Sequence, residues 1–378
     1  MTQALRRLSA LDQMRGLVMV LMTIDHASEW LNTGRFVTDA SWFWKPGTPI
    51  PGDQFVLRWV THLCAPTFVF LAGVGIALST QKRRAQGDSE AAIDRTLIAR
   101  GLFIVALEMF WMTPVMMEGK GILLQVLYAI GFSMVLMVPL RRIPARVLSI
   151  GALAFFALSE LLVGLAIMAS GGESPSWPAA LLLTAGLFPI ELGPLKRLIA
   201  AYPVLPWLAI MALGHACAGF FARPNQDGAV EKKLVGAGVL SLAVFGVVRG
   251  LNGYGNMSLL RDDLAPLQWL HVSKYPPSIT FLTLELGLMA LLLAGFYRLE
   301  RRGVELRWLS VLGQAALFYY VIHIHFIGAI ASLLGVAHQG GVGAALIGAA
   351  LAVLALSYPA ARYQRYKAAH PGSWTRYL

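Results

Sequence analysis

Long apolar stretches, separated by short polar segments, run along almost the whole chain. A helix needs about 20 mostly apolar residues to cross the hydrocarbon core of a bilayer. Ten stretches satisfy this length, so the pattern predicts ten transmembrane helices. The predicted spans are Leu11–Leu31, Leu57–Thr80, Arg95–Met116, Gly121–Leu140, Arg146–Ser170, Ala200–Phe221, Lys233–Gly250, Ser278–Arg298, Trp308–Gly335 and Gly341–Tyr358.

A further apolar stretch, Trp177–Ile190, is short and contains Pro178 and Pro189. The apolar pattern leaves open whether it is interfacial, re-entrant or spanning. The 31 Lys and Arg residues favour ten spans. With ten spans most of them lie on the side of the N-terminus, whereas an eleventh span would divide them almost evenly. Because basic residues concentrate on the cytoplasmic side of membrane proteins, we expect both termini in the cytoplasm.

Composition supports a membrane protein and excludes soluble classes. The chain is 57% hydrophobic and only 13% charged, whereas soluble domains contain about 25% charged residues. The first span is interpreted as a retained helix, because a cleaved signal peptide would not contain Asp12, Arg15 and Asp25. The net charge of +11 is attributed to cytoplasmic anchoring and not to a nucleic-acid partner. The expected fold is an all-α polytopic bundle, one transmembrane domain over residues 1–378.

Histidines and carboxylates inside the spans are the first candidates for chemistry, because polar groups within a bilayer are costly and tend to be functional. His26 lies roughly 22 Å along the first span from Leu11, in the outer half of the membrane. We expect Asp25 or Glu29 to orient it as a general base, since Glu29 shares its helix face. His62 lies at a similar outer depth in the second span.

The ninth span contributes His323 and His325 at the same outer depth, and only one of the two can easily face the groove of the others. Lys274 and Tyr275 lie just above this level, in the predicted outer loop 251–277. Together these residues predict a polar site near the outer face of the membrane.

A second candidate group is basic and lies at the cytoplasmic side. Arg83 and Arg84 follow the second span, while Arg15 and Arg100 lie within spans. Topology anchoring explains most basic residues at helix ends, but it explains Arg15 and Arg100 less well. We therefore expect the group to contact the phosphates of an anionic nucleotide carrier.

Several motifs in a fixed order resemble one known family. They lie at or near the entrances of predicted spans: Leu11-Asp12-Gln13-Met14-Arg15-Gly16, His62-Leu63-Cys64-Ala65-Pro66-Thr67-Phe68-Val69-Phe70-Leu71-Ala72-Gly73, Pro203-Val204-Leu205-Pro206-Trp207, Ser273-Lys274-Tyr275-Pro276-Pro277-Ser278 and Phe318-Tyr319-Tyr320-Val321-Ile322-His323. This order resembles the catalytic-domain family of heparan-α-glucosaminide N-acetyltransferases, whose bacterial members are grouped as DUF1624 within the transmembrane acyltransferases. The resemblance covers essentially the whole chain.

The resemblance implies transfer of an acyl group, usually acetyl, from cytoplasmic acyl-CoA to an acceptor beyond the membrane. A histidine of the first helix or first outer loop is central to that chemistry, and His26 is the nearest candidate because no histidine lies between it and His62. His62 or Lys274 would assist at the oxyanion, and Tyr275 and His323 would contact the acceptor. The basic residues Arg15, Arg100, Arg83 and Arg84 would hold the CoA phosphates.

The expected partners are the lipid bilayer, acyl-CoA and a glycan or small-molecule acceptor, with no metal; a homodimer stays open. The expected location is the bacterial inner membrane. A proton-coupled transporter or permease is the alternative function, in which the same histidines and carboxylates would relay protons. A non-catalytic assembly partner would leave Asp25, His26 and Glu29 inside the membrane without an explanation.

Overall fold

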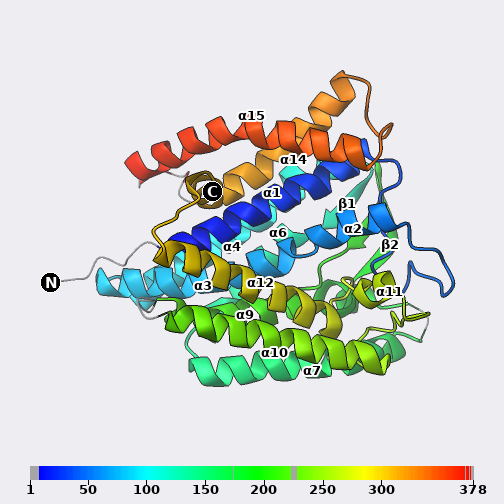
Figure 1. The fold of residues 1–378 in the computed structure, drawn as a ribbon, viewed down its shortest axis with the longest axis horizontal. Coiled ribbons are helices and arrows are strands. Elements are labelled where there is room, and N and C mark those ends of the chain that lie inside the picture. Colours follow the sequence, from blue (N-terminus) through cyan, green and yellow to red (C-terminus); the bar gives the residue numbers. More distant parts are fainter. Residues whose placement is uncertain (1–7, 173, 223–227, 371, 374, 376–378) are drawn as a thin grey trace.

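The computed structural model describes residues 8–172, 174–222, 228–370, 372–373 and 375. Most of these residues lie in helices (Figure 1). The α-helices are α1 (Ser9–Leu31), α2 (Gly52–Thr61), α3 (Cys64–Ala85), α4 (Glu90–Leu107), α5 (Thr113–Met116), α6 (Val126–Leu140), α7 (Ala145–Ala169), α8 (Trp177–Ala179), α9 (Val204–Phe221), α10 (Ala229–Leu251), α11 (Pro266–Leu270), α12 (Ile279–Arg301), α13 (Arg307–Gln314), α14 (Ala316–Leu333) and α15 (Val342–Ala369). Two π-helical segments, η1 (Glu108–Met112) and η2 (Ala180–Thr184), interrupt or extend them.

The fold is an all-α polytopic membrane bundle, as predicted. Within the described residues, eight helical segments are long and apolar enough to cross a membrane. Two further helices occupy the positions of the remaining predicted spans. These are α1, which is 23 residues long but carries charged side chains, and α6, which has 15 residues.

Three predicted spans differ from the observed elements. The span predicted at 57–80 consists of α2 and α3, which are separated by a break at His62 and Leu63. The span predicted at 308–335 is divided into α13 and α14 at Ala315. The span predicted at 121–140 begins as strand β1 (Gly121–Leu124), and its helix starts only at Val126. An apolar run does not by itself separate a buried strand from a helix.

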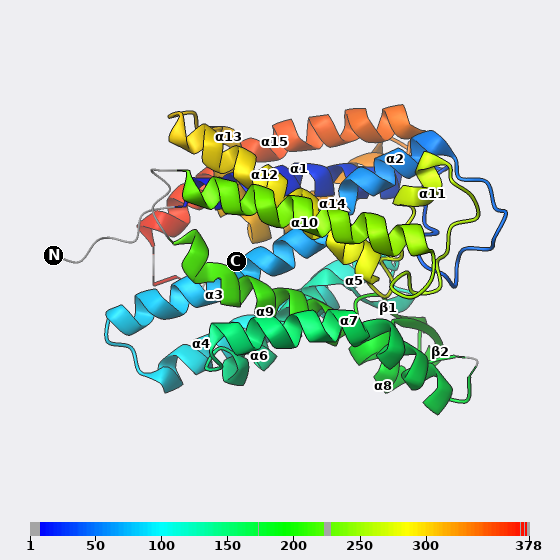
Figure 2. The ribbon, with the colours of Figure 1, turned by 60° about the horizontal axis from the view of Figure 1, so that its bottom comes forward.

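The stretch Trp177–Ile190 is not a span. It forms the short helix α8, the π-helical segment η2 and most of strand β2 (Gly186–Leu192). Strand β3 (Leu195–Ala200) pairs antiparallel with β2 and parallel with β1, giving the strand order β1-β3-β2. This small sheet lies at the end of the bundle opposite the start of α1 and the end of α15 (Figures 1 and 2). We call these the sheet end and the terminus end.

Helix α1 lies inside the bundle, between α14 and α15 on one side and α3 and α12 on the other (Figure 1). Helices α7, α10 and α15 lie at the periphery, and their outward side chains are apolar. Examples are Ile150 and Leu153 of α7, Val239 of α10 and Leu354 of α15, all of which are exposed. Such a surface suits the hydrocarbon of a bilayer, where it carries no cost.

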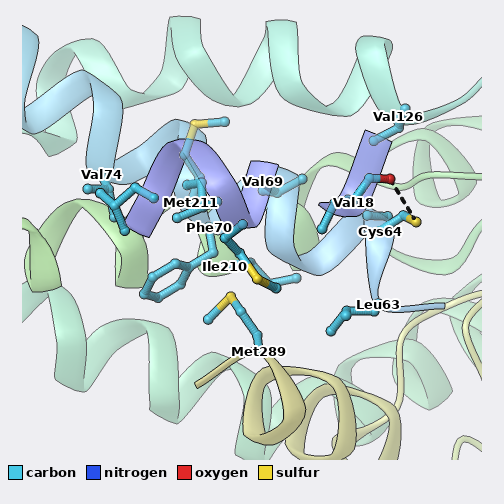
Figure 3. Close-up of a cluster of buried hydrophobic side chains, with 14 of the residues drawn as sticks. Val18, Leu63, Cys64, Val69, Phe70, Val74, Val126, Ile210, Met211 and Met289 are labelled. Atoms are coloured by element: carbon cyan, nitrogen blue, oxygen red, sulfur yellow. Dashed lines mark hydrogen bonds between the residues drawn. The ribbon is translucent and has the colours of Figure 1, made fainter. Parts of the chain in front are cut away.

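A continuous apolar core joins α3, α9 and α12 (Figure 3). Val69 and Phe70 of α3 meet Ile210 and Met211 of α9, and all four side chains are buried. At the edge of this cluster the thiol of Cys64 approaches the carbonyl oxygen of Val18 at 3.5 Å. The first half of α3 is therefore held by packing on several sides.

Reciprocal glycines bring pairs of helices into backbone contact. A Cβ at Gly16 of α1 would clash with the carbonyl oxygen of Leu309 in α13, and a Cβ at Gly313 would clash with that of Asp12. Small residues allow such close approach between membrane helices. The same close backbone contact joins α3 to α9 through Gly73 and Gly214, and α4 to α6 through Gly101 and Gly131. Gly238 of α10 and Gly287 of α12 also face each other, but the atoms nearest to an added Cβ there belong to leucine side chains.

An ion cluster fixes the loop after α1 to α2 at the sheet end. Arg58 donates from Nε and Nη2 to Oδ2 of Asp39, at 3.0 and 2.8 Å, and His62 lies 3.0 Å from the same oxygen. Burial would raise the pKa of Asp39, but the charge of Arg58 and the hydrogen bond with His62 lower it well below its ordinary value. Asp39 is therefore a buried carboxylate that stays ionised.

We expect Gly16→Ala to lower the free energy of unfolding by about 3 kcal/mol or more, because the added methyl group collides with backbone and not with a flexible side chain. Thermal unfolding in detergent measures the change. Gly151→Ala in α7 is the matched control, since a Cβ there meets no atom within 4 Å. Equal melting temperatures for the two variants would contradict this account.

We expect Asp39→Asn to lower the free energy of unfolding at pH 7 by about 3–5 kcal/mol, because Arg58 loses the partner of a buried charge. The lowered pKa of Asp39 means that its stabilisation is complete above about pH 4 and declines as the pH falls further. The difference between wild type and variant therefore narrows below pH 4. Asp53→Asn, at an exposed position of α2, is the control. A constant difference between pH 7 and pH 3 would refute the ionic role of Asp39.

Candidate functional site

One face of α1 lines two adjoining cavities. Its residues Asp12, Arg15, Met19, Met22, His26 and Glu29 follow one another at alternating intervals of three and four. Side chains with this spacing lie on the same side of a helix. Asp12 to Met22 line the larger cavity, and Met22 to Glu29 line the smaller one. This face of α1 therefore extends from the large cavity to the small cavity.

The large cavity has a volume of about 470 Å³ and lies between α1, α3, α4, α6 and α14. Most of its wall is apolar, with Phe68 and Ile130 as examples. Four basic residues line it near the terminus end of these helices and of α15. They are Arg15, Arg83, Arg100 and Lys367. The cavity thus combines an apolar interior with a cationic end.

Two of the predicted phosphate-binding arginines are engaged by carboxylates. Arg15 donates to Oδ1 of Asp12 at 3.1 Å and to the carbonyl oxygen of Leu71 at 3.2 Å. Arg83 forms an ion pair with Asp88 at 2.5 Å, although it still lines the cavity.

Arg100 and Arg84 differ in how they are placed. The guanidinium of Arg100 lines the large cavity and makes no hydrogen bond or ion pair with a described residue. Arg84 does not line the cavity; it forms an exposed ion pair with Glu90 at 2.6 Å. Arg84 is therefore separate from the large cavity, and its contact with a ligand stays a prediction.

The small cavity, of about 60 Å³, lies toward the sheet end. Met22, Val126 and Tyr320 line both cavities, so the two spaces meet at these side chains. Five of the predicted site residues come together in its wall. These are Asp25, His26, Glu29, Lys274 and Tyr275, joined by Arg35, Arg58, Thr61, Cys64 and Tyr202.

His26 is oriented by a histidine and not by a carboxylate. Its Nδ1 lies 2.7 Å from Nε2 of His323, and Nδ1 of His323 lies 3.1 Å from the carbonyl oxygen of Tyr319. A carbonyl only accepts, so Nδ1 of His323 carries a proton and its neutral ring accepts at Nε2. Nδ1 of His26 then donates. This assignment leaves Nε2 of His26 as an unprotonated lone pair beside the small cavity.

The predicted orienting carboxylates have other partners, which corrects that expectation. Asp25 accepts from Nη1 of Arg58 at 2.8 Å and from Nη2 of Arg35 at 3.2 Å. Glu29 forms an ion pair with Arg35. Burial lowers the pKa of Arg35, while the charge of Asp25 acts in the opposite direction. The carboxylates of α1 therefore balance arginines in the wall of the cavity.

His62 and Lys274 occupy different positions. His62 is buried behind the wall, bonded to Asp39, and does not line either cavity. The structure shows its contact with Asp39, and its catalytic role stays a prediction. Lys274 does line the small cavity, and its Nζ lies 5.4 Å from the ring centre of Tyr275. His323 also lies outside the wall, and it contacts His26 in place of an acceptor.

Several residues that line the cavities are absent from the sequence-based prediction. Helical spacing could have identified some of them. The alternating spacing along α1 identifies Met19 and Met22 together with Arg15 and His26. Tyr320 precedes His323 by three residues and so shares its helix side. No local signal identifies Arg35, because its role depends on a loop folding back onto α1.

No group of three or more His, Cys, Asp or Glu side chains suited to a metal ion occurs within the described ranges.

Comparison with known proteins identifies one family. The model of the family described as heparan-alpha-glucosaminide N-acetyltransferase, catalytic, matches residues 7–248, which is more than half of the 378-residue chain. No curated protein matches the chain. The matched region includes α1 to α4, α6 and α9, and with them His26, Arg15, Arg100 and Val126. The chain therefore belongs to the heparan-α-glucosaminide N-acetyltransferase catalytic family and is an integral membrane protein of a transferase family.

Proposed function

We propose that the protein transfers an acyl group from acyl-CoA in the large cavity to an acceptor in the small cavity. The observation that carries this proposal is the meeting of the two cavities at Met22, Val126 and Tyr320, directly beside His26. A donor that enters one cavity and an acceptor that enters the other would bring their reacting atoms together there. Acetyl is the group that the family name supports.

The large cavity suits a nucleotide carrier. Its basic end offers Arg100, Arg15 and Lys367 to phosphates, which arginines bind by charge-assisted hydrogen bonds. Arg15 and His26 are eleven residues apart on α1, which corresponds to roughly 16 Å along the helix axis. The pantetheine arm of CoA is long enough to cover such a distance, and the apolar wall suits its chain.

The proposed reaction uses Nε2 of His26 as the base. It takes the proton from the hydroxyl or amine of the acceptor as that atom attacks the thioester carbonyl carbon. The carbonyl oxygen becomes an oxyanion, which the ammonium of Lys274 stabilises. The intermediate then collapses, the carbon–sulfur bond breaks, and the CoA thiolate takes the proton from the His26 imidazolium.

The charge of the loops supports the orientation in this proposal. Because basic loops favour the cytoplasm, we propose that the terminus end faces the cytoplasm, where acyl-CoA is available, and that the sheet end faces outward. The proposed location is a bacterial inner membrane. The small cavity contains three basic and two acidic side chains among hydroxyl and amide groups. Such a wall favours a polar acceptor, such as a sugar or a glycan end.

We expect His26→Ala to reduce acyl transfer from labelled acetyl-CoA by about 10²–10⁴-fold, because the base is lost. Binding of acetyl-CoA, followed by thermal shift of the detergent-solubilised protein, should stay within a few-fold of wild type. His325→Ala is the matched control, because His325 stacks on Trp111 outside both cavities.

Undiminished transfer by His26→Ala would exclude it as the base. Solute uptake by proteoliposomes without any binding or turnover of acyl-CoA would instead favour the transporter function. The acceptor screen for both experiments consists of free hexosamines and membrane glycan fragments, supplied at the outer face.

We expect Arg100→Ala to raise KM for acetyl-CoA about tenfold or more, with kcat nearly unchanged, because a hydrogen bond to a charged group contributes about 1.5–3 kcal/mol. Arg95→Ala is the control, since Arg95 lies on the same helix, is exposed and does not line the cavity. Equal KM values for the two variants would show that the phosphates bind elsewhere.

A further inference from the structure

The meeting point of the two cavities consists of three side chains from three helices. Met22 belongs to α1, Val126 is the first residue of α6, and Tyr320 belongs to α14. Each is nearly buried, with 5, 6 and 4% of its surface exposed. We call these three residues the neck. The proposed proton transfer does not require these three side chains.

The neck separates two spaces of very different size. The large cavity holds about 470 Å³, whereas the small cavity beyond the neck holds about 60 Å³. The space beyond the neck is therefore about one eighth of the volume of the large cavity, and an acceptor group must share it.

The wall beyond the neck is also chemically different. Arg58, Asp25 and Lys274 line it, and the first two form a buried ion pair. A hydrocarbon chain in this space would displace water from charged groups without replacing their hydrogen bonds, which is costly. Size and polarity thus act against the same ligand, a long acyl tail.

The direction of donor entry makes the acyl tail the leading group. A thioester anchored by its phosphates near Arg100 presents the acyl end toward Tyr320 and His26, whose rings lie 6.1 Å apart edge to face. When the carbonyl carbon lies beside His26, every further carbon of the acyl group must fit within the neck or pass beyond it.

We propose, on the basis of the proposed function, that Met22, Val126 and Tyr320 set the length of the transferred acyl group. The neck admits the two-carbon acetyl group and rejects longer chains. Val126 has a special place in this filter. It is the first residue of α6 and closely follows strand β1. The carboxylate of Glu108 accepts hydrogen bonds from the amides of Leu127 and Tyr128 and so fixes this end of the helix. The filter therefore has a rigid side.

The test compares kcat/KM for acetyl-, butyryl- and hexanoyl-CoA in detergent-solubilised protein with one acceptor. One additional methylene group in a hydrophobic pocket changes the ratio of kcat/KM between two substrates by about 10–200-fold. We therefore expect wild type to prefer acetyl over butyryl by about 10²-fold or more. Met22→Ala and Val126→Ala should each reduce this ratio by about tenfold, through a gain for butyryl-CoA.

Matched controls remove the same volume away from the neck. The controls are Met211→Ala and Val69→Ala. Both residues are buried in the core of Figure 3, and neither lines a cavity. They should keep the acetyl preference of wild type. A larger side chain at the neck provides the opposite test, because it narrows the neck and leaves no empty space that could destabilise the fold. Val126→Leu should lower turnover of acetyl-CoA about tenfold while free CoA, which has no acyl group, shifts the melting temperature as in wild type.

The outcomes separate the two proposals. Acetyl transfer together with an unchanged chain-length ratio in both alanine variants would overturn the neck as the filter. So would a wild type that uses butyryl-CoA as well as acetyl-CoA. Absence of any CoA binding and of any transfer in wild type and variants would overturn the proposed function itself.

Discussion

The guanidinium of Arg58 is the charge on which the sheet end of the bundle depends. It is almost fully buried and lies between Asp25 of α1 and Asp39 of the following loop. Its Nη2 also reaches the hydroxyl of Tyr275, at 3.2 Å. A buried charge is tolerated only with a complete set of partners. Three segments far apart in the sequence must therefore assemble around Arg58 before its burial is compensated.

This arrangement explains why His26, the proposed base, contacts a side chain of another helix. Asp25 is adjacent to His26 in sequence, but its oxygens are committed to Arg58, Arg35 and Thr61. The ring of His26 instead relies on His323 of α14, whose own proton is directed to a backbone carbonyl. A histidine partner adds no charge of its own when neutral. In the proposed reaction, the imidazole is thus positioned without a carboxylate that competes for the proton.

The sequence predicts the helical architecture well because the bilayer imposes a length and an apolar composition on each span. It also places His26, Lys274 and Tyr275 in one site. It fails where partners are distant in the chain. Nothing local distinguishes strand Gly121–Leu124 from the helix that follows, since its pairing partner is Leu195–Ala200.

His62 shows what depth along a span does not predict. A fixed rise per residue gives its depth from the sequence. The sequence does not give its partner, because Asp39, whose Oδ2 lies 3.0 Å from Nε2 of His62, belongs to the loop that precedes α2.

The reciprocal glycines have a mechanical consequence for the large cavity. Its lining includes both helices of the pairs α1–α13 and α4–α6, and it includes α3, which contacts α9 through Gly73 and Gly214. Helices joined in this way cannot slide past or tilt against each other without a collision between main chains. A change in the width of the cavity would therefore require whole pairs of helices to move together. Motions of this collective kind take microseconds to milliseconds. The rate of exchange of a large ligand would then depend on the motion of these helix pairs, and not on the faster rotation of individual side chains.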